Sequence, residues 1–218
     1  MVLKLHCLPS STCSRRVLVT LEEAGIPYEI VDVNLFAGEQ KGASHLKLQP
    51  FGKIPVLDDD GFILYESRAI CKYIAKKYGK GKLIPQDGDL KAFALFEQAC
   101  SVELCQYDGP SFKICYEKVF KQMRGQGPPD EAILEPARKE IEIVFAVYEN
   151  TLSKQAYLAG DELTVVDLYH LSNGNYIRGV GEKGLFEKFP HVEKWFSGLE
   201  NSESWKKTIS LGKPLPGR

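Results

Sequence analysis

Residues 1–80 alternate between strand-like and helix-like patterns of hydrophobic positions. Four short apolar or alternating segments predict strands, at residues 2–7, 28–33, 54–57 and 62–65. Apolar residues at helical spacing predict one helix that ends at Gly25 and another that begins at Ser67. This order of elements predicts a small α/β domain built on a mixed sheet.

After residue 88 the strand signals disappear and helical patterns take over. Helices are predicted at about 89–123 and 131–153, near Thr164 in the capping-box pattern Thr164-Val-Val-Asp167, and near Pro190. The stretch 81–88, which contains Gly and Pro, is typical of a linker. We therefore predict two domains, an α/β domain over residues 1–80 and an all-helical domain over residues 89–218. The capping box is expected to serve folding and to have no chemical role.

The composition narrows the range of functions. With 28 basic and 29 acidic residues, the net charge is -1, which argues against an extended nucleic-acid surface. No uncharged apolar run approaches the length of a membrane span, and the first residues lack the pattern of a secretion signal, so we expect a cytosolic protein. The six cysteines match no zinc spacing and the four histidines are scattered, so no metal site is predicted.

The segment Pro9-Ser-Ser-Thr-Cys-Ser-Arg-Arg-Val17 lies between the first predicted strand and the first helix. The first turn of a helix carries unpaired N–H groups and a partial positive charge, so it favours an anion such as a thiolate. Several hydroxyl groups gather there, and capping of the helix by Ser10, Ser11 or Thr12 is the alternative interpretation. Thiols at helix N-termini ionise more readily than free thiols, which makes Cys13 a second candidate.

Two further segments of the α/β domain carry candidate binding groups. In Gln49-Pro-Phe-Gly-Lys-Ile-Pro-Val56, a cis Ile54–Pro55 bond would let the Ile54 backbone pair with an extended peptide, and a plain turn into an edge strand is the alternative. In Tyr65-Glu-Ser-Arg-Ala-Ile70, Ser67 is a suitable helix cap, and the free N–H groups beside it can bind a carboxylate. Glu66 can accept a hydrogen bond from an ammonium group.

The order and spacing of these segments resemble the cytosolic glutathione transferases, and most closely their phi class. The similarity is carried by Ser11, by residues 38–41, 50–56 and 66–70, and in the second half by residues 157–161 and 163–168. The resemblance implies a thioredoxin-like α/β N-terminal domain of order β-α-β-α-β-β-α and an all-α C-terminal domain. It also implies a homodimeric enzyme that joins the glutathione thiolate to small hydrophobic electrophiles, with the reduction of organic peroxides as a further reaction.

The resemblance implies a role for each matching residue. Ser11 corresponds to the serine whose hydroxyl holds the glutathione sulfur as a thiolate, and Arg16 is either a source of positive field nearby or a surface arginine. The residues at glutathione-binding positions are Gln40, Lys41, Lys53, Ile54, Pro55, Glu66 and Ser67. Gln40 stands where plant phi enzymes usually have histidine, and Lys53 stands where many have glutamine, so both positions keep a donor side chain.

The expected electrophile pocket is apolar and lies between the two domains. Its candidate residues are Leu8, Leu35 and Phe36 from the first half and Phe112, Tyr116 and Tyr176 from the second, with core packing as the alternative for each. Two other functions remain open. A cysteine-type thiol transferase would form a mixed disulfide between Cys13 and glutathione, and a carrier protein would bind hydrophobic ligands with little or no turnover.

Overall fold

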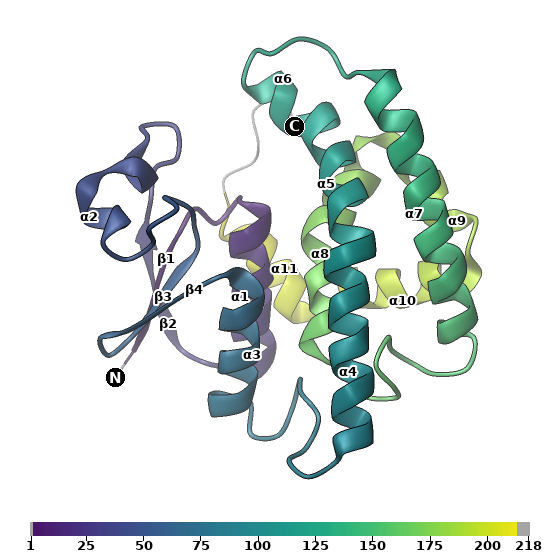
Figure 1. Ribbon diagram of the computed structural model, residues 1–218, viewed down its shortest axis with the longest axis horizontal. Helices are drawn as coiled ribbons and strands as arrows, with labels where there is room; N and C mark the ends of the chain where they lie inside the picture. Colours follow the sequence, from purple (N-terminus) through teal and green to yellow (C-terminus); the bar gives the residue numbers. More distant parts are fainter. Residues whose placement is uncertain (1, 213–218) are drawn as a thin grey trace. The chain divides into compact units, whose positions relative to one another are not determined.

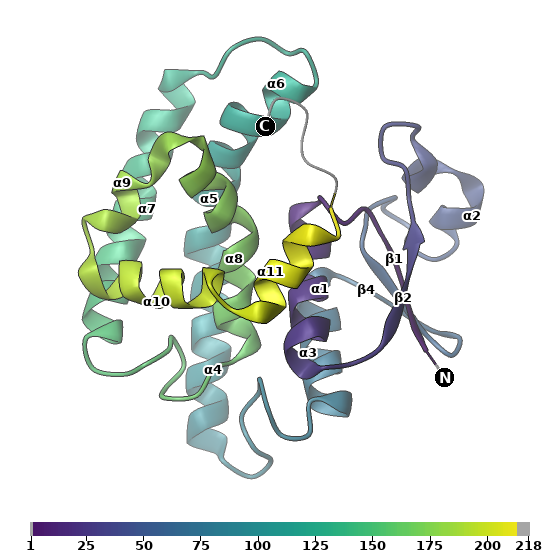
Figure 2. The same cartoon turned by 180° about the vertical axis from the view of Figure 1, so that it is seen from behind.

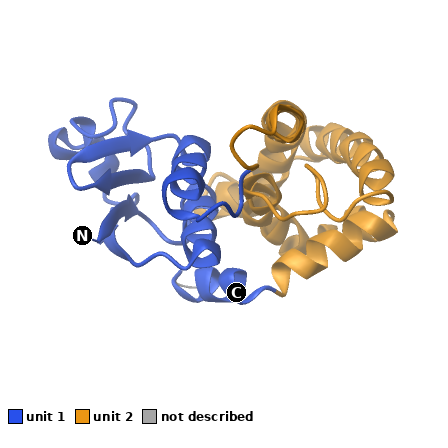
Figure 3. Cartoon of the chain, turned by 90° about the horizontal axis from the view of Figure 1, so that it is seen from below, with its two compact units in different colours: residues 1–84, 202–218 blue, residues 85–201 orange. Residues whose placement is uncertain are grey.

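The computed structural model of this chain describes residues 2–212, which form two compact units (Figure 3). The first unit comprises the described parts of residues 1–84 and 202–218, and the second comprises residues 85–201. No helix within residues 2–212 combines the length and the apolar character that a membrane span requires.

The first unit is built on a four-stranded mixed sheet (Figure 1). Its strands are β1 Leu3–Cys7, β2 Tyr28–Asp32, β3 Val56–Asp59 and β4 Phe62–Tyr65, in the order β2-β1-β3-β4. β1 runs parallel to β2 and antiparallel to β3, and β3 runs antiparallel to β4. The predicted mixed sheet is therefore confirmed. β3 begins at Val56 and not at residue 54, because Pro55 has no N–H group to give to the strand pairing.

A tight turn joins β3 to β4. Its two central residues, Asp60 and Gly61, have φ values of 54° and 89°, and two positive φ values are what a type I′ hairpin turn requires. Asp58 Oδ1 accepts a hydrogen bond from the Gly61 N–H at 2.8 Å and stabilises the turn. Because the turn fixes the register of the hairpin, the end of β4 lies opposite the start of β3.

Helices cover both faces of this sheet (Figures 1 and 2). α1 Thr12–Ala24 and α3 Ser67–Tyr78 lie side by side on one face, and the short α2 Ala43–Leu46 lies on the other, after the 3-10 turn η1 Glu39–Lys41. α1 ends as predicted at Gly25, which adopts the left-handed conformation with φ 66°. The elements therefore follow the predicted order β-α-β-α-β-β-α.

The helix α11 Glu203–Ser210 packs against α1 within the first unit (Figure 2). Trp205 is almost fully buried, Ser204 donates a hydrogen bond to Glu23, and Lys207 Nζ lies 2.6 Å from a carboxylate oxygen of Glu22. The sequence predicts a helical domain that runs to residue 218, whereas α11 belongs to the α/β unit. An amphipathic pattern shows which face of a helix is buried, but not which neighbour buries it.

The second unit is helical. Its first part is a continuous series of α4 Leu90–Val102, the π-helical η2 Glu103–Tyr107, α5 Asp108–Cys115, the π-helical η3 Tyr116–Phe120 and α6 Lys121–Met123. It continues with α7 Glu131–Leu152, α8 Val165–Ile177, the kinked η4 Arg178–Glu182, α9 Gly184–Glu187 and α10 Pro190–Glu200. The helices predicted at 89–123, at 131–153 and near Thr164 and Pro190 are confirmed. The sequence did not predict the π-helical segments, because one extra residue in a turn leaves the apolar pattern nearly unchanged.

The predicted capping box at the start of α8 is a buried polar centre. Asp167 is fully buried, and its carboxylate accepts hydrogen bonds of 3.0–3.1 Å from four groups: the Leu158 N–H, the Thr164 N–H, the Thr164 hydroxyl and Trp195 Nε1. The box is confirmed. It joins the start of α8 to the preceding loop and to α10, as expected of a folding element.

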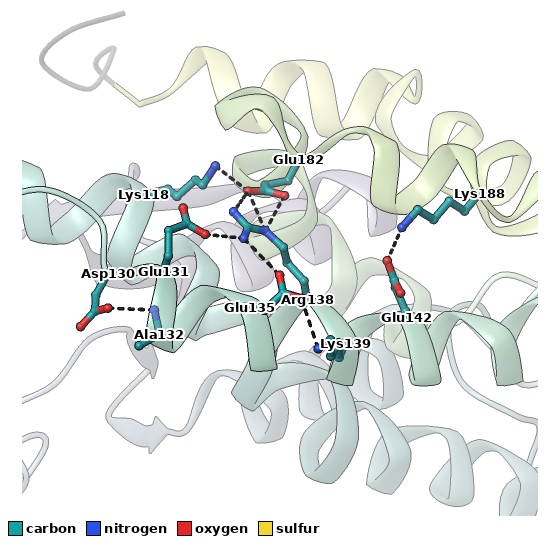
Figure 4. A network of polar contacts seen from close by, with 10 residues as sticks. All are labelled: Lys118, Asp130, Glu131, Ala132, Glu135, Arg138, Lys139, Glu142, Glu182 and Lys188. Carbon is teal, nitrogen blue, oxygen red and sulfur yellow. Dashed lines mark hydrogen bonds and ion pairs between the residues drawn. The ribbon is translucent and has the colours of Figure 1, made fainter.

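A charged network joins α7 to the segment that follows α8 (Figure 4). Arg138 donates to both carboxylate oxygens of Glu182 over 2.8–3.2 Å, and its Nη1 lies 2.6 Å from Glu131. Lys118 contacts the same Glu182 carboxylate at 2.5 Å. Burial by itself would raise the pKa of Glu182, but the hydrogen bonds from Arg138 and Lys118 outweigh burial, and the pKa is lowered.

Candidate active site

The strand register brings three segments of the first unit to one edge of the sheet. β1 ends at Cys7, antiparallel β3 begins there with Val56 opposite His6, and β4 ends there with Tyr65 opposite Val56. The turn before α1, the loop before β3 and the start of α3 therefore share this edge. We call this region, made of residues 8–16, 49–55 and 65–67, the site edge. The predicted site residues on it are Leu8, Ser11, Arg16, Lys53, Ile54, Pro55, Glu66 and Ser67.

Ser11 is the N-cap residue of α1. Its backbone is extended, with φ -70° and ψ 138°, its carbonyl accepts from the Arg15 N–H at 2.9 Å, and its own N–H donates to the Leu8 carbonyl at 2.9 Å. Within residues 2–212, the Ser11 side chain makes no hydrogen bond that caps the helix. The alternative in which Ser11 acts as a capping side chain is therefore wrong, and its half-buried hydroxyl stands beside the open first turn of α1.

Glu66 and Ser67 open α3 with an unusual backbone. Glu66 is the N-cap residue and has φ 71° and ψ 108°, a left-handed conformation that residues other than glycine seldom adopt. Backbone strain of this kind often persists at functional sites. Ser67, which the sequence suggested as the cap, is instead the first residue of the helix, and it is only 6% exposed. The Glu66 side chain is exposed to solvent.

Two buried side chains hold the loop before β3 from either side. The Lys53 N–H donates to Gln49 Oε1 at 3.1 Å, and the Lys53 carbonyl lies 2.8 Å from His45 Nε2. The Lys53 side chain remains exposed, and the Ile54–Pro55 bond is cis. The sequence assigned neither Gln49 nor His45 a role, because both bind the backbone of a loop whose path only the fold defines.

Gln40 and Lys41 lie in the turn η1 and contact this loop. Lys41 Nζ donates to the Phe51 carbonyl at 2.9 Å. Gly52 has φ 60°, and a Cβ added to it would come within 2.7 Å of Lys41 Cδ and 2.8 Å of the Gln40 carbonyl. Only glycine fits at this position. The close packing places the backbone of η1 directly against the loop that carries Lys53.

Arg16, the last residue of the first site-edge segment, is buried. It is 1% exposed, so the interpretation as a surface arginine is wrong. Its Nη1 donates to Ser67 Oγ at 3.0 Å and to Cys13 Sγ at 3.8 Å. One guanidinium nitrogen therefore connects the first turn of α1 with the first residue of α3.

The residues predicted for the electrophile pocket are divided between the units. In the first unit, Leu8 and Leu35 are half-buried, and Phe36 is 75% exposed. Core packing is therefore not the role of Phe36, which presents most of its ring to solvent.

In the second unit, the candidate aromatic residues form one cluster. Phe112, which is 47% exposed, has its ring centroid 6.2 Å from that of Tyr116 and 6.3 Å from that of Phe120. Tyr176 is buried and sets its ring edge-on to Phe120 at 5.6 Å. Phe120 was not among the predicted residues, although the four-residue spacing of 112, 116 and 120 along a helix is the signal that points to it.

None of the six cysteines, which all lie within residues 2–212, forms a disulfide bond. Burial, with a smaller contribution from the charge of Asp32, raises the pKa of Cys7 to about 12, so this thiol is not a nucleophile at neutral pH. Cys13 is half-buried in the first turn of α1. In the part of the chain that the structure describes, no three His, Cys, Asp or Glu side chains are grouped in a way that would hold a metal ion.

Comparison with known proteins assigns both units. Residues 10–77 match the model for the glutathione S-transferase N-terminal domain, and residues 110–203 match that for the C-terminal domain. Glutathione S-transferase hmp2 of Hypomyces subiculosus is 48% identical over 96% of this chain and 99% of its own length. A glutathione S-transferase of Arabidopsis thaliana is 44% identical over 89% of both chains. The structure of glutathione S-transferase I from maize, in complex with an atrazine glutathione conjugate, has a TM-score of 0.92 and 36% identity over 98% of this chain and 99% of that chain.

These matches confirm the thioredoxin-like unit and the all-helical unit that the sequence predicted. The chain belongs to the glutathione S-transferase family, as a phi-class-like member. It is an enzyme with glutathione as its co-substrate.

Proposed function

We propose that Ser11 activates glutathione by donating the hydrogen of its hydroxyl to the thiolate sulfur. A free thiol has a pKa of about 8.5, and lowering it by one unit requires a preference of about 1.4 kcal/mol for the thiolate. One hydrogen bond to a charged sulfur, with the positive end of α1, supplies roughly 2–3 kcal/mol. That preference makes the thiolate the main form of bound glutathione at neutral pH.

The observation that carries this proposal is the state of the Ser11 side chain. Serine at an N-cap normally accepts a hydrogen bond from the helix backbone, whereas in residues 2–212 the Ser11 hydroxyl makes no such bond. The first turn of α1 therefore keeps its N–H groups for an anion, and Ser11 keeps its donor for the same anion. A thiolate held there is bound and activated by one element.

The other subsites follow from the site edge and from η1. We assign the glycine carboxylate of glutathione to Lys41 and Lys53, with Gln40 as a further donor, because all three come from two chain segments that pack directly on each other. The Ile54 backbone, before Pro55, pairs with the cysteinyl part. The γ-glutamyl end lies at Glu66 and Ser67, where an exposed carboxylate meets the open start of α3.

For the second substrate we propose small hydrophobic electrophiles, with organic peroxides as a further class. The aromatic cluster of Phe112, Tyr116 and Phe120, supported by Tyr176, offers apolar ring surface in the helical unit. Leu8, Leu35 and Phe36 are the corresponding apolar candidates of the α/β unit. Aromatic and aliphatic side chains of this kind bind ligands by excluding water from apolar surface.

We also propose a homodimer and a cytosolic location. Each unit exposes large apolar side chains that an interface would cover, among them Phe51 and Phe62 in the first unit and Leu90 and Phe93 in the second. Six cysteines without a disulfide among the described residues suit a reducing compartment.

Replacing Ser11 tests the mechanism. In Ser11→Ala, we expect kcat/KM for conjugation of a chloronitrobenzene to fall about 100-fold, because a hydrogen bond to a charged sulfur is lost. The pH at which the conjugation rate reaches half its maximum should rise by roughly two units. The matched controls are Ser10→Ala and Cys13→Ser.

The controls separate the three functions that the sequence left open. Loss of activity in Cys13→Ser, with Ser11→Ala unchanged, identifies a cysteine-type thiol transferase and rejects our assignment. If the unmodified protein is a carrier, it should bind glutathione and an apolar dye. Its rates of conjugation and of cumene hydroperoxide reduction should then stay near the uncatalysed rates. Activity that depends on Ser11 alone supports the serine mechanism.

A further inference from the structure

Arg16 of α1 contacts α3 through both its side chain and its backbone. Its Nη1 donates to Ser67 Oγ at 3.0 Å, and its backbone carbonyl accepts from Cys71 Sγ at 3.3 Å and from Thr20 Oγ1 at 2.9 Å. Ser67 and Cys71 are one turn apart on α3, so α1 is attached to α3 at two successive points. The side chain and the backbone of a single residue therefore fix the place of Ser67 relative to α1.

The contact with Arg16 also fixes what the Ser67 hydroxyl can do. A guanidinium group only donates hydrogen bonds, so Ser67 Oγ is the acceptor in this pair. A hydroxyl has one hydrogen of its own, which the bond with Arg16 leaves unused. Ser67 is the first residue of α3, and the N–H groups of a first helical turn have no partners within the helix. The Ser67 hydrogen and these N–H groups together suit a ligand that only accepts hydrogen bonds, such as a carboxylate.

The buried charge of Arg16 strengthens this arrangement. With the Arg16 side chain 1% exposed and the Ser67 side chain nearly as well buried, water screens the interaction between guanidinium and hydroxyl only weakly. A hydroxyl that accepts from a cation becomes a better donor, because successive hydrogen bonds polarise one another. A carboxylate at the start of α3 is therefore favoured by Arg16 without direct contact.

We propose that Arg16 is a positioning residue for glutathione, which acts through Ser67 on the carboxylate of the γ-glutamyl group. This inference rests on the proposed placement of glutathione at the site edge. Arg16 thereby contributes to the choice of glutathione over thiols that lack the γ-glutamyl part. A residue that only packed α1 against α3 would support all thiol substrates equally.

The test compares glutathione with cysteinylglycine, the dipeptide that lacks the γ-glutamyl group. In Arg16→Lys and Arg16→Met, we expect kcat/KM for glutathione to fall about tenfold, mainly through KM, and kcat/KM for cysteinylglycine to change less than about twofold. The preference for glutathione then falls about tenfold, equivalent to about 1.4 kcal/mol. Lysine keeps the charge and methionine keeps the apolar stem, and thermal unfolding shows which variants are folded.

A mostly buried arginine outside the site serves as the matched control. Arg178 of the helical unit has a side chain that is 12% exposed and forms ion pairs with Glu193 at 2.8 Å and Glu200 at 3.2 Å. Arg178→Lys should lower the melting temperature and leave the preference for glutathione unchanged. Equal changes of preference in Arg178→Lys and Arg16→Lys would show that stability alone is responsible, and would overturn the proposal.

A double-mutant cycle with Ser67→Ala distinguishes this inference from the proposed function. Because Arg16 acts through Ser67, the Arg16→Lys change should alter the preference less than about twofold once Ser67 is alanine. Two outcomes reject the role of Arg16 and leave the proposed function intact. One is that the losses of preference in the two single variants add in the double variant. The other is that a folded Arg16 variant keeps the preference while Ser67→Ala loses it. An unchanged preference in Ser67→Ala rejects the γ-glutamyl subsite itself, and with it both proposals.

Discussion

α1 and α3 of the α/β unit begin in a different way from the long helices α4, α7 and α8 of the helical unit. In the helical unit the long helices start with side chains that bind the first turn: Asp89 caps α4, Asp130 caps α7 and the Thr164–Asp167 box opens α8. In the α/β unit, α1 and α3 start at Ser11 and Glu66, and within the described residues neither of these side chains makes a capping hydrogen bond. Both of these helix starts without a capping side chain lie at the site edge.

The difference follows from location and not from the unit as a whole. α11 also lies in the α/β unit, away from the site edge, and Ser202 Oγ caps it by accepting from the Trp205 N–H at 3.2 Å. A capped helix start stabilises the fold, whereas an uncapped start leaves N–H groups for an anionic ligand. The same residue type, serine at an N-cap, therefore serves stability in α11 and, in our proposal, ligand binding in α1.

The largest effect is expected at the buried box of α8. Asp167→Asn replaces a carboxylate that accepts from four groups by an amide that must direct its own N–H hydrogens toward donors. We expect the free energy of unfolding to fall by about 3 kcal/mol, which lowers the melting temperature by roughly 6–12 °C. The folded fraction should keep its KM for glutathione.

The control for this prediction is a carboxylate in the neighbouring loop. Asp161 is exposed and accepts one hydrogen bond, from the Ala156 N–H at 3.2 Å. Asp161→Asn should lower the stability by less than about 1 kcal/mol. An equal loss in both variants, or a change in KM for glutathione in Asp167→Asn, would contradict the purely structural role of the box.

A pH-dependent effect of intermediate size is expected at Glu182. Its pKa is below the usual value of about 4.3 for glutamate, so its ionised form stabilises the folded state. That contribution is complete above the unfolded pKa and is lost as the pH falls through the lowered folded pKa. Glu182→Gln should lower the free energy of unfolding by about 2 kcal/mol at pH 7. The difference in this free energy between the variant and the unmodified protein should shrink below about pH 4.

Urea unfolding at a series of pH values measures this difference. The control is Glu131→Gln, which removes another carboxylate partner of Arg138 whose side chain is 69% exposed. Because solvent screens exposed ion pairs, this variant should change the stability little at any pH. A difference between Glu182→Gln and the unmodified protein that stays constant down to pH 3 would rule out Glu182 as the titrating group.

Sequence patterns predicted most of the fold because its elements are locally encoded. Gly25 ends α1, the Asp60–Gly61 turn sets the β3–β4 hairpin, and the Thr164–Asp167 box opens α8, each through interactions between near neighbours in the chain. The position of α11 escaped prediction because its partner α1 lies far away in the sequence. The π-helical segments escaped it because a single inserted residue hardly changes an apolar pattern.

The candidate site was predicted unevenly for the same reason. Motif spacing pointed to Ser11, Glu66 and Ser67, and the strand register then brings these segments to one edge of the sheet. Motif spacing indicated no role for Gln49 or His45, which hold the Lys53 backbone by hydrogen bonds. Burial of Arg16 depends on how α1 packs on α3, which no local pattern encodes.

The smallest effect is a matched pair of serine substitutions in the α/β unit. Ser202→Ala removes the cap of α11 and should cost about 1 kcal/mol, or about 2–4 °C in melting temperature. Ser11→Ala removes an N-cap serine that makes no capping bond, so it should change the stability by less than about 0.5 kcal/mol. The kinetic effects should be reversed, because only Ser11 is proposed to touch the sulfur. Thermal unfolding and conjugation rates, measured on both variants, check the pair.

A Ser11→Ala protein that loses as much stability as Ser202→Ala would mean that the Ser11 hydroxyl caps α1 in solution, and the contrast between the two helix starts would be wrong.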